Sequence, residues 1–211
     1  KNEKPWGVIL FKRNILKKKQ LKKLTSSIKK IMKDKKYPIL IDEEGGKVTR
    51  LTNFLNNSIF NQNFFGNIYE KDKKIGLILY KRYIESISIH LLNLGININT
   101  SPVLDLYQKS AHKIIGNRSY SENPTTVNKL GQACVKFYKN NKIGTVIKHI
   151  PGHGAANVDS HFNLPVVKKN FMYLKKNDFE CFKNIKSHFA MTAHILYDKI
   201  DNINNATHSK V

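Results

Sequence analysis

Short apolar runs alternate with longer amphipathic segments along this chain. Continuous apolar runs bounded by glycine, proline or polar residues predict buried strands at Trp6–Phe11, Pro38–Asp42, Ile96–Val103, Ile143–His149 and Phe189–Leu196. Apolar residues at helical spacing predict helices around Leu21–Ile31 and Val127–Phe137, and further helices over residues 71–94 and 170–187. Glycine and polar residues predict loops at Glu43–Gly46 and Pro151–Asn163.

Buried strands separated by helices indicate an α/β fold with a parallel sheet and right-handed crossovers. A doubly wound sheet and a (β/α)8 barrel both fit this alternation. The chemically interesting residues follow the carboxyl ends of several strands, which favours the barrel. Because a barrel has eight strands and the 211 residues supply five, we expect an incomplete barrel. We expect strand 1 and strands 7 and 8 to lie outside the chain, and residues 1–211 to be one domain truncated at both ends.

The net charge of +22 raises the possibility of a nucleic-acid partner. However, 33 of the 37 basic residues are lysine, and they are spread over the expected outer helix faces. Nucleic-acid grooves usually combine arginine with stacking aromatic residues. We therefore interpret the charge as a solvated surface and expect no nucleic-acid partner.

Other features of the composition suggest a soluble protein of the cytoplasm. No apolar run approaches the roughly 18 residues of a membrane span, so no membrane partner is expected. Cys134 and Cys181 lack metal-site spacing and lie in helical patterns, which favours buried free thiols and agrees with a reducing compartment. We expect a cytoplasmic monomer that needs no cofactor and no metal.

The segment from Lys148 to His161 concentrates polar chemistry after an expected strand. The strand delivers Lys148 and His149, and a Pro/Gly turn then opens a polar loop that carries Asp159 and His161. Residues i and i+2 of extended backbone point the same way, so Asp159 can hydrogen-bond His161. A carboxylate in that place fixes the imidazole tautomer and raises the pKa of the ring, which suits a general acid/base near neutral pH.

The same segment resembles the signature of β-N-acetylglucosaminidases of glycoside hydrolase family 3, K-H-[FI]-P-G-[HL]-G-x4-D-[ST]-H, at every specified position. Four more motifs of that family follow in its order, at residues 41–50 (IDEEGGKVTR), 101–105 (SPVLD), 115–120 (IGNRSY) and 191–194 (MTAH). Within these motifs Lys47 stands where the family usually has Arg, and Asn117 where it usually has Asp. The resemblance extends over residues 6–208.

The resemblance implies a bacterial enzyme that removes terminal β-linked N-acetylglucosamine from small carbohydrate substrates, the muropeptide fragments of peptidoglycan recycling. His161 is expected to be the general acid/base, oriented by Asp159. The sugar ring is expected to be held by Asp42, Arg50, Arg118, Lys148 and His149. In a chain that uses lysine for most positive charges, the two arginines of this set indicate positions that need a planar fork of donors. Glu44, Asp105 and His194 could line the pocket or support it from behind.

The reaction of such enzymes also needs a carboxylate nucleophile, which the resemblance places on the loop after strand 7 in a segment like F-S-D-D. The 211 residues contain no such segment. We therefore expect the chain alone to show no turnover.

Three alternatives remain at this point. His149, His153, Asp159 and His161 are residue types that bind zinc, so a metal-dependent hydrolase is possible, although their spacing lacks the helical placement of an HExxH site. A basic nucleic-acid-binding module is the second alternative. A β-glucosidase of the same family is the third, and the Asp159–Ser160–His161 triplet argues against it.

Overall fold

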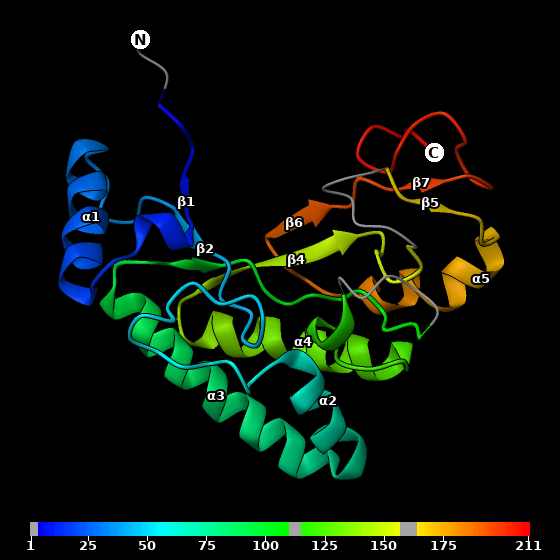
Figure 1. Ribbon diagram of the computed structural model, residues 1–211, viewed down its shortest axis with the longest axis horizontal. Coiled ribbons are helices and arrows are strands. Elements are labelled where there is room, and N and C mark those ends of the chain that lie inside the picture. Colours follow the sequence, from blue (N-terminus) through cyan, green and yellow to red (C-terminus); the bar gives the residue numbers. More distant parts are fainter. Residues whose placement is uncertain (1–3, 110–114, 157–163) are drawn as a thin grey trace.

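The computed structural model describes residues 4–109, 115–156 and 164–211. Its main sheet has five parallel strands that lie side by side in chain order (Figure 1). They are β1 (Val8–Leu10), β2 (Ile39–Ile41), β3 (Ile98–Asn99), β4 (Gly144–Ile150) and β6 (Phe189–Thr192). A doubly wound sheet reverses its strand order at a switch point, whereas the strands of a barrel follow one another. The order therefore indicates part of a barrel, as expected.

Helices connect the strands and cover the sheet. They are α1 (Lys18–Ile31), α2 (Gln62–Lys71), α3 (Lys73–Asn93), α4 (Pro124–Asn140) and α5 (Phe171–Lys176), with short 3-10 helices η1 (Lys12–Asn14), η2 (Gly116–Arg118) and η3 (Phe179–Phe182). In Figure 1, α2, α3 and α4 lie on one side of β4. The helix α4 turns Val127, Leu130 and Cys134 into the core that it shares with the sheet. Their spacing of three and four residues places them on one helix face, which is why this segment folds as a helix here.

Four of the five strands are shorter than their predicted runs, and the runs 96–103 and 189–196 change most. Only Ile98–Asn99 of the run 96–103 is a strand, because Pro102 has no N–H to donate to a ladder. Val103 still pairs with Lys148 in an isolated bridge. The run 189–196, predicted as one buried strand, divides between β6 and β7 (Leu196–Tyr197), and β6 is mostly exposed because it lies at the edge of the described sheet. The strand β7 pairs with β5 (Val166–Val167) in a separate two-stranded parallel sheet.

The helix predicted over residues 170–187 is wrong. The structure has α5, which ends at Lys176, and then η3. The Asn177 side chain bonds back to the Tyr173 carbonyl oxygen at 2.8 Å, and Asn184 has a positive φ of 60°. Side-chain bonds of this kind offer the backbone an alternative to continuing the helix. Helix α2 is not predicted by the sequence pattern, whereas α3 agrees closely with the helix predicted over residues 71–94.

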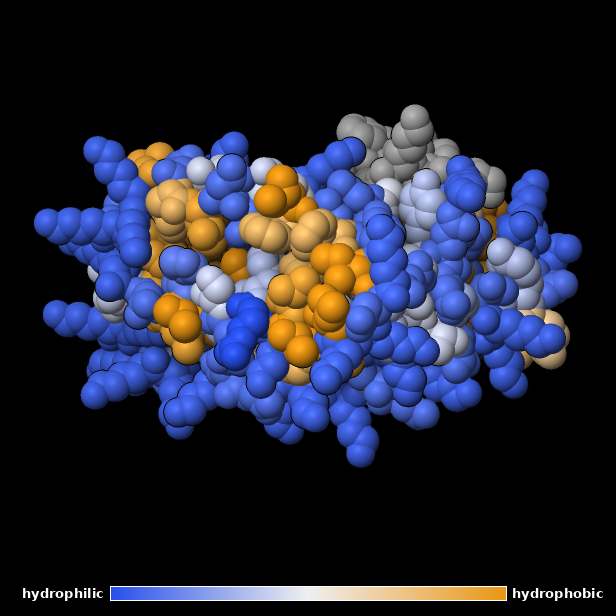
Figure 2. Space-filling view, turned by 90° about the horizontal axis from the view of Figure 1, so that it is seen from below, coloured by the Kyte–Doolittle hydropathy of each residue, from blue (hydrophilic) through white to orange (hydrophobic). Residues whose placement is uncertain are grey.

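The predicted burial of the cysteines is confirmed, and the surface beneath the helices is mostly hydrophilic. Cys134 and Cys181 are both buried and free, as predicted. Figure 2 shows hydrophilic side chains over most of the face beneath the helices, with an apolar group among them. Exposed apolar residues of α3, including Ile75, Ile78 and Ile89, are on the outside of the molecule. None of the helices in the described ranges is long and apolar enough to cross a bilayer.

Candidate functional site

Polar side chains from several strand ends meet in one cavity of about 450 Å³. Asp42 follows β2, and Lys148 and His149 lie in the last part of β4. Arg50 comes from the loop after β2 and Arg118 ends the short helix η2, and both line the same cavity. Parallel strands bring their carboxyl ends to one edge of the sheet, which is why residues more than 100 positions apart are neighbours here. The volume is within the roughly 300–1,000 Å³ of small-molecule sites.

Lys148 lies at the centre of this group with only 2% of its surface exposed. Its Nζ is 2.5 Å from Glu44 Oε1 and 3.2 Å from Asp42 Oδ1, and it donates to Thr100 Oγ1 at 3.2 Å. A buried ammonium needs such partners, because leaving it unpaired in the interior is very costly. These contacts hold the side chain in one place at the floor of the cavity.

Glu44 connects Lys148 to Arg118. The Arg118 guanidinium donates to Glu44 through Nε at 2.8 Å and through Nη2 at 3.0 Å, a two-point contact with fixed geometry. Burial opposes ionisation of Glu44, but Lys148 and Arg118 outweigh it, so the pKa of this carboxyl is below its usual value. Burial likewise opposes the charged form of Arg118, and Glu44 outweighs it and raises the pKa of the guanidinium.

Asp42 carries the second carboxylate of the cavity. It is bound by Arg50 Nη2 at 3.1 Å, by Lys148 and by the Thr100 hydroxyl. Burial opposes its ionisation, but Lys148 and these hydrogen bonds lower its pKa to about 2. Asp42 is therefore an anion at neutral pH and presents acceptor oxygens to the cavity.

The loop that places Arg50 is organised by Glu43, which points away from the cavity. Its carboxylate is 1% exposed and accepts from the backbone N–H groups of Arg50 and Leu51 at 2.8 and 3.2 Å. Asn57 Nδ2 and the Thr49 hydroxyl donate to it as well. Arg50 Nε is buried and has no hydrogen-bond partner in the described structure.

His149 and His153 are held by a third carboxylate, that of Asp105. His149 Nδ1 lies 2.6 Å from Asp105 Oδ2, and the His153 N–H donates to Oδ1 at 2.7 Å. Asp105 is completely buried, and burial opposes its ionisation, but His149 and the neighbouring donors lower its pKa to about 2. Burial lowers the pKa of His153, so this ring is neutral at pH 7.

The structure therefore brings together five of the seven residues that the sequence singled out: Asp42, Arg50, Arg118, Lys148 and His149. The expected acid/base pair, Asp159 and His161, lies outside the described residues. Two of the four ligands of the metal-site alternative lie there too. In the described ranges no group of three His, Cys, Asp or Glu side chains is arranged to hold a metal ion.

Sequence reasoning underestimated Glu44 and Asp105. Glu44 contacts both Lys148 and Arg118, and Asp105 holds both histidines. Their positions directly after strands were a signal, but a side chain that supports others has the same sequence context as one that faces a ligand. The sequence did not decide whether His194 lines the pocket or supports it. In the structure His194 lines the cavity, and its Nδ1 lies 2.9 Å from Thr207 Oγ1.

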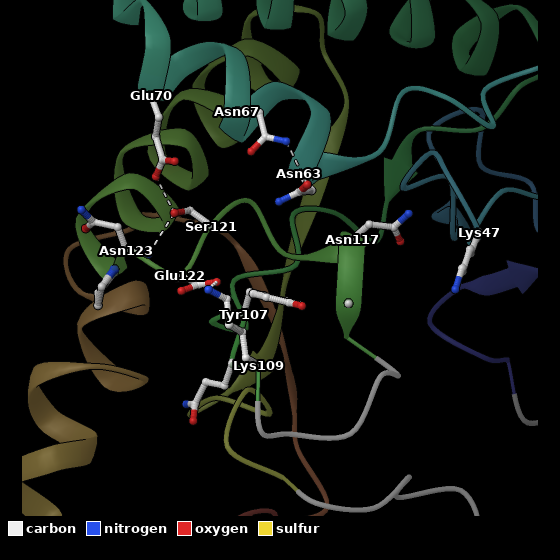
Figure 3. A pocket seen from close by; sticks show the side chains of 13 residues that line it. Lys47, Asn63, Asn67, Glu70, Tyr107, Lys109, Asn117, Ser121, Glu122 and Asn123 are labelled. Carbon is white, nitrogen blue, oxygen red and sulfur yellow. Dashed lines mark hydrogen bonds and ion pairs between the residues drawn. The ribbon is translucent and has the colours of Figure 1, made fainter.

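A larger open groove of about 1150 Å³ lies beside this cavity (Figure 3). Lys47 and Asn117 line the groove, and their sequence neighbours Val48 and Arg118 line the cavity, so the two share a wall. In the groove Glu70 is bound by the Ser121 hydroxyl at 2.5 Å, and Lys109 pairs with Glu122 at 3.4 Å. The smaller cavity is the better candidate site, because its charged groups are buried and converge on one space.

Comparison with known proteins identifies the family of the chain. The whole chain, residues 1–211, matches the family described as glycosyl hydrolase family 3 N terminal domain. It is 35% identical over 204 residues to beta-hexosaminidase A of Pseudoalteromonas piscicida, covering 93% of this chain and 34% of that protein. It is 30% identical over 208 residues to the beta-hexosaminidase of Hydrogenovibrio crunogenus, covering 93% and 55%.

Solved structures confirm the fold. Native NagZ from Neisseria gonorrhoeae matches with a TM-score of 0.84 at 31% sequence identity, covering 93% of this chain and 57% of that one. The same protein has been crystallised in complex with N-trifluoroacetyl-D-glucosamine, and that structure matches with a TM-score of 0.83. The chain spans between a third and somewhat over half of the length of these relatives. The strand order, the cavity at the strand ends and the match over all 211 residues together show that the chain belongs to the N-terminal domain family of glycosyl hydrolase family 3.

Proposed function

We propose that the protein is a retaining β-N-acetylglucosaminidase that releases terminal β-linked N-acetylglucosamine from muropeptide fragments. The observation that supports this most directly is the group of charged side chains around Lys148 in a cavity of sugar-binding size. Relatives of the chain are named beta-hexosaminidases, and the similar NagZ from Neisseria gonorrhoeae has been crystallised with an N-acylated glucosamine.

The residues divide the work by their chemistry. The Asp42 carboxylate accepts hydrogen bonds from sugar hydroxyl groups, while Lys148, Arg50 and Arg118 donate to hydroxyl oxygens. Because these side chains already hold one another, they need little rearrangement when a sugar binds, and the entropy lost on binding stays small.

Bond cleavage is assigned to Asp159 and His161. A carboxylate nucleophile attacks the anomeric carbon as the C1–O bond breaks, and His161 transfers its proton to the leaving oxygen. Water then gives a proton to His161 and attacks the same carbon, which releases the carboxylate and the sugar. Asp159 orients the ring and favours its protonated form.

Leaving-group dependence tests this assignment. The full-length protein is given aryl N-acetyl-β-D-glucosaminides whose phenols range from acidic to weakly acidic, and H161A and D159A are compared with wild type. An acidic phenol leaves without proton donation, so the substitutions should lower kcat/KM only slightly for its glycoside. For the glycoside of a weakly acidic phenol the decrease in kcat/KM should be at least tenfold larger. Equal losses for all phenols would contradict the acid/base role.

The same preparations separate the alternatives. Hydrolysis of aryl glucosides in preference to aryl N-acetylglucosaminides would indicate a β-glucosidase. Stoichiometric zinc, together with loss of activity on chelation, would indicate the metal-dependent hydrolase. For the substrate class, N-acetylglucosaminyl-anhydro-muropeptides should have a higher kcat/KM than chitobiose, and the opposite order would remove the muropeptide proposal.

The sugar-binding assignment has a matched control. D42N should lower kcat/KM by about tenfold or more, because an amide in place of the carboxylate loses the charge-assisted contacts. Asp34 is the control: it too is an aspartate with a hydrogen-bond donor, the backbone N–H of Lys36, but it is exposed and does not line the cavity. D34N should therefore keep the wild-type kcat/KM.

A further inference from the structure

Asp105 lies behind the cavity, on the loop that follows β3, and contacts the end of β4 and the turn after it. One of its oxygens, Oδ1, accepts two backbone N–H groups, those of His149 at 3.2 Å and His153 at 2.7 Å. The other oxygen, Oδ2, is 2.6 Å from His149 Nδ1. The side chain is 0% exposed, so water does not compete for either oxygen.

We propose that Asp105 is a positioning residue that holds the His149 ring in the Nδ1–H tautomer and turns its bare Nε2 toward the sugar as a hydrogen-bond acceptor. The consequence for catalysis rests on the proposed function, whereas the tautomer itself does not. This assignment makes His149 an acceptor for a sugar hydroxyl, beside the donors Lys148 and Arg118.

When the His149 ring is neutral, the contacts leave one arrangement of its hydrogen. An ionised carboxylate only accepts hydrogen bonds, so His149 Nδ1 has to carry the hydrogen that lies between it and Asp105 Oδ2. In the neutral imidazole the other nitrogen then has a free lone pair. No partner for Nε2 is present in the described structure, and the ring lines the cavity.

An isosteric substitution reverses this arrangement. In D105N one of the two oxygens becomes an NH₂ group. It cannot occupy the Oδ1 position, because two backbone N–H donors already point there. The amide nitrogen therefore faces His149 Nδ1 and donates to it, which drives the hydrogen of the ring to Nε2. The ring keeps its place, but it now presents a donor to the cavity instead of an acceptor.

The tautomer can be read directly by ¹⁵N NMR on the full-length protein labelled in histidine. At about pH 8.5, above the ordinary pKa of an imidazole, the wild-type His149 Nε2 should show the shift of an unprotonated ring nitrogen. H149Q identifies the signals by removing them. In D105N the unprotonated shift should move to Nδ1. An unprotonated Nδ1 in the wild type, or the same tautomer in both proteins, would overturn the proposal.

Asp178 supplies the matched control. It is also fully buried, and it accepts from Gln108 Nε2 at 3.3 Å, but it makes no described hydrogen bond to His149. D178N should leave the His149 signals in the wild-type pattern. If D178N also exchanges them, the effect comes from loss of a buried charge in general, and the role assigned to Asp105 is wrong.

Kinetics connect the tautomer to the reaction. D105N should lower kcat/KM for an aryl N-acetylglucosaminide by about 10- to 100-fold, by analogy with the losses seen when the partner behind a metal-binding histidine is replaced. If D105N exchanges the tautomer but keeps the wild-type kcat/KM, the proposed role of the His149 tautomer in sugar binding is wrong. If the wild-type protein hydrolyses no glycoside at all, the proposed function fails while the NMR result on the tautomer stands.

Discussion

Lys148 and Glu44 face each other at the floor of the cavity, with 2.5 Å between Nζ and Oε1 and only 3% and 2% of their side chains exposed. Glu44 also receives the fork of Arg118, so one carboxylate holds two cations. Such pairs are costly to break, because removing one partner leaves the other charge buried without compensation.

Replacing Glu44 with Gln should therefore destabilise the fold by about 3–5 kcal/mol in urea unfolding. Glu85 is the matched control, since it also pairs with two cations, Lys81 at 3.8 Å and Arg82 at 3.0 Å, but on the surface of α3. E85Q should cost no more than about 1 kcal/mol. Comparable losses in the two variants would show that burial does not govern the Glu44 contact.

Acid should weaken the fold through Asp42 and Asp105. Both carboxyls have a pKa of about 2, below the value of 3.8 for a free aspartate, because the contacts with Lys148 and His149 respectively outweigh burial. Their charged forms stabilise the folded state above about pH 4, and that contribution is lost as the pH falls toward 2. The free energy of unfolding should decrease over this interval, with a smaller decrease in D42N. A stability that is flat from pH 4 to 2 would contradict the assignment.

Asp178 should show the opposite dependence. Burial, with a smaller contribution from Asp105, raises its pKa to about 6. A raised pKa means that its contribution to stability is present below about pH 4 and is lost as the pH rises through 6. The stability of D178N relative to wild type should therefore increase between pH 4.5 and 7.5, measured by urea unfolding. The exposed Asp34 gives the comparison, and D34N should show no such trend.

Gly66 is needed where α2 docks on the loop that follows Arg118. A Cβ at this position would lie 1.8 Å from the Tyr120 carbonyl oxygen, so the helix would have to move. G66A should cost about 1–3 kcal/mol or more in the free energy of unfolding, despite the better helix propensity of alanine. The next residue, Asn67, is exposed on the same helix, and N67A should be neutral or slightly stabilising. A stable G66A would show that α2 docks less tightly than described.

Much of this protein follows from local sequence. The positions of the five strands, the helices α1, α3 and α4 and the buried cysteines were predictable, because apolar periodicity reports which face of an element leaves water. The burial predicted for the last of these strands was wrong, since β6 is mostly exposed. Five cavity residues were also predictable, since their motifs follow strand ends. The length of β3 and the end of α5 were not, because they depend on a proline and on side-chain bonds that compete with the backbone.

Tertiary structure alone decided what the supporting residues do. Sequence shows a glutamate after β2 and an aspartate after β3, but not that Glu44 binds Lys148 and Arg118 or that Asp105 binds the His149 ring. These partners lie 44 to 104 positions apart in the chain. They meet because parallel strands carry their carboxyl ends to one edge, and burial there makes each charge require a partner.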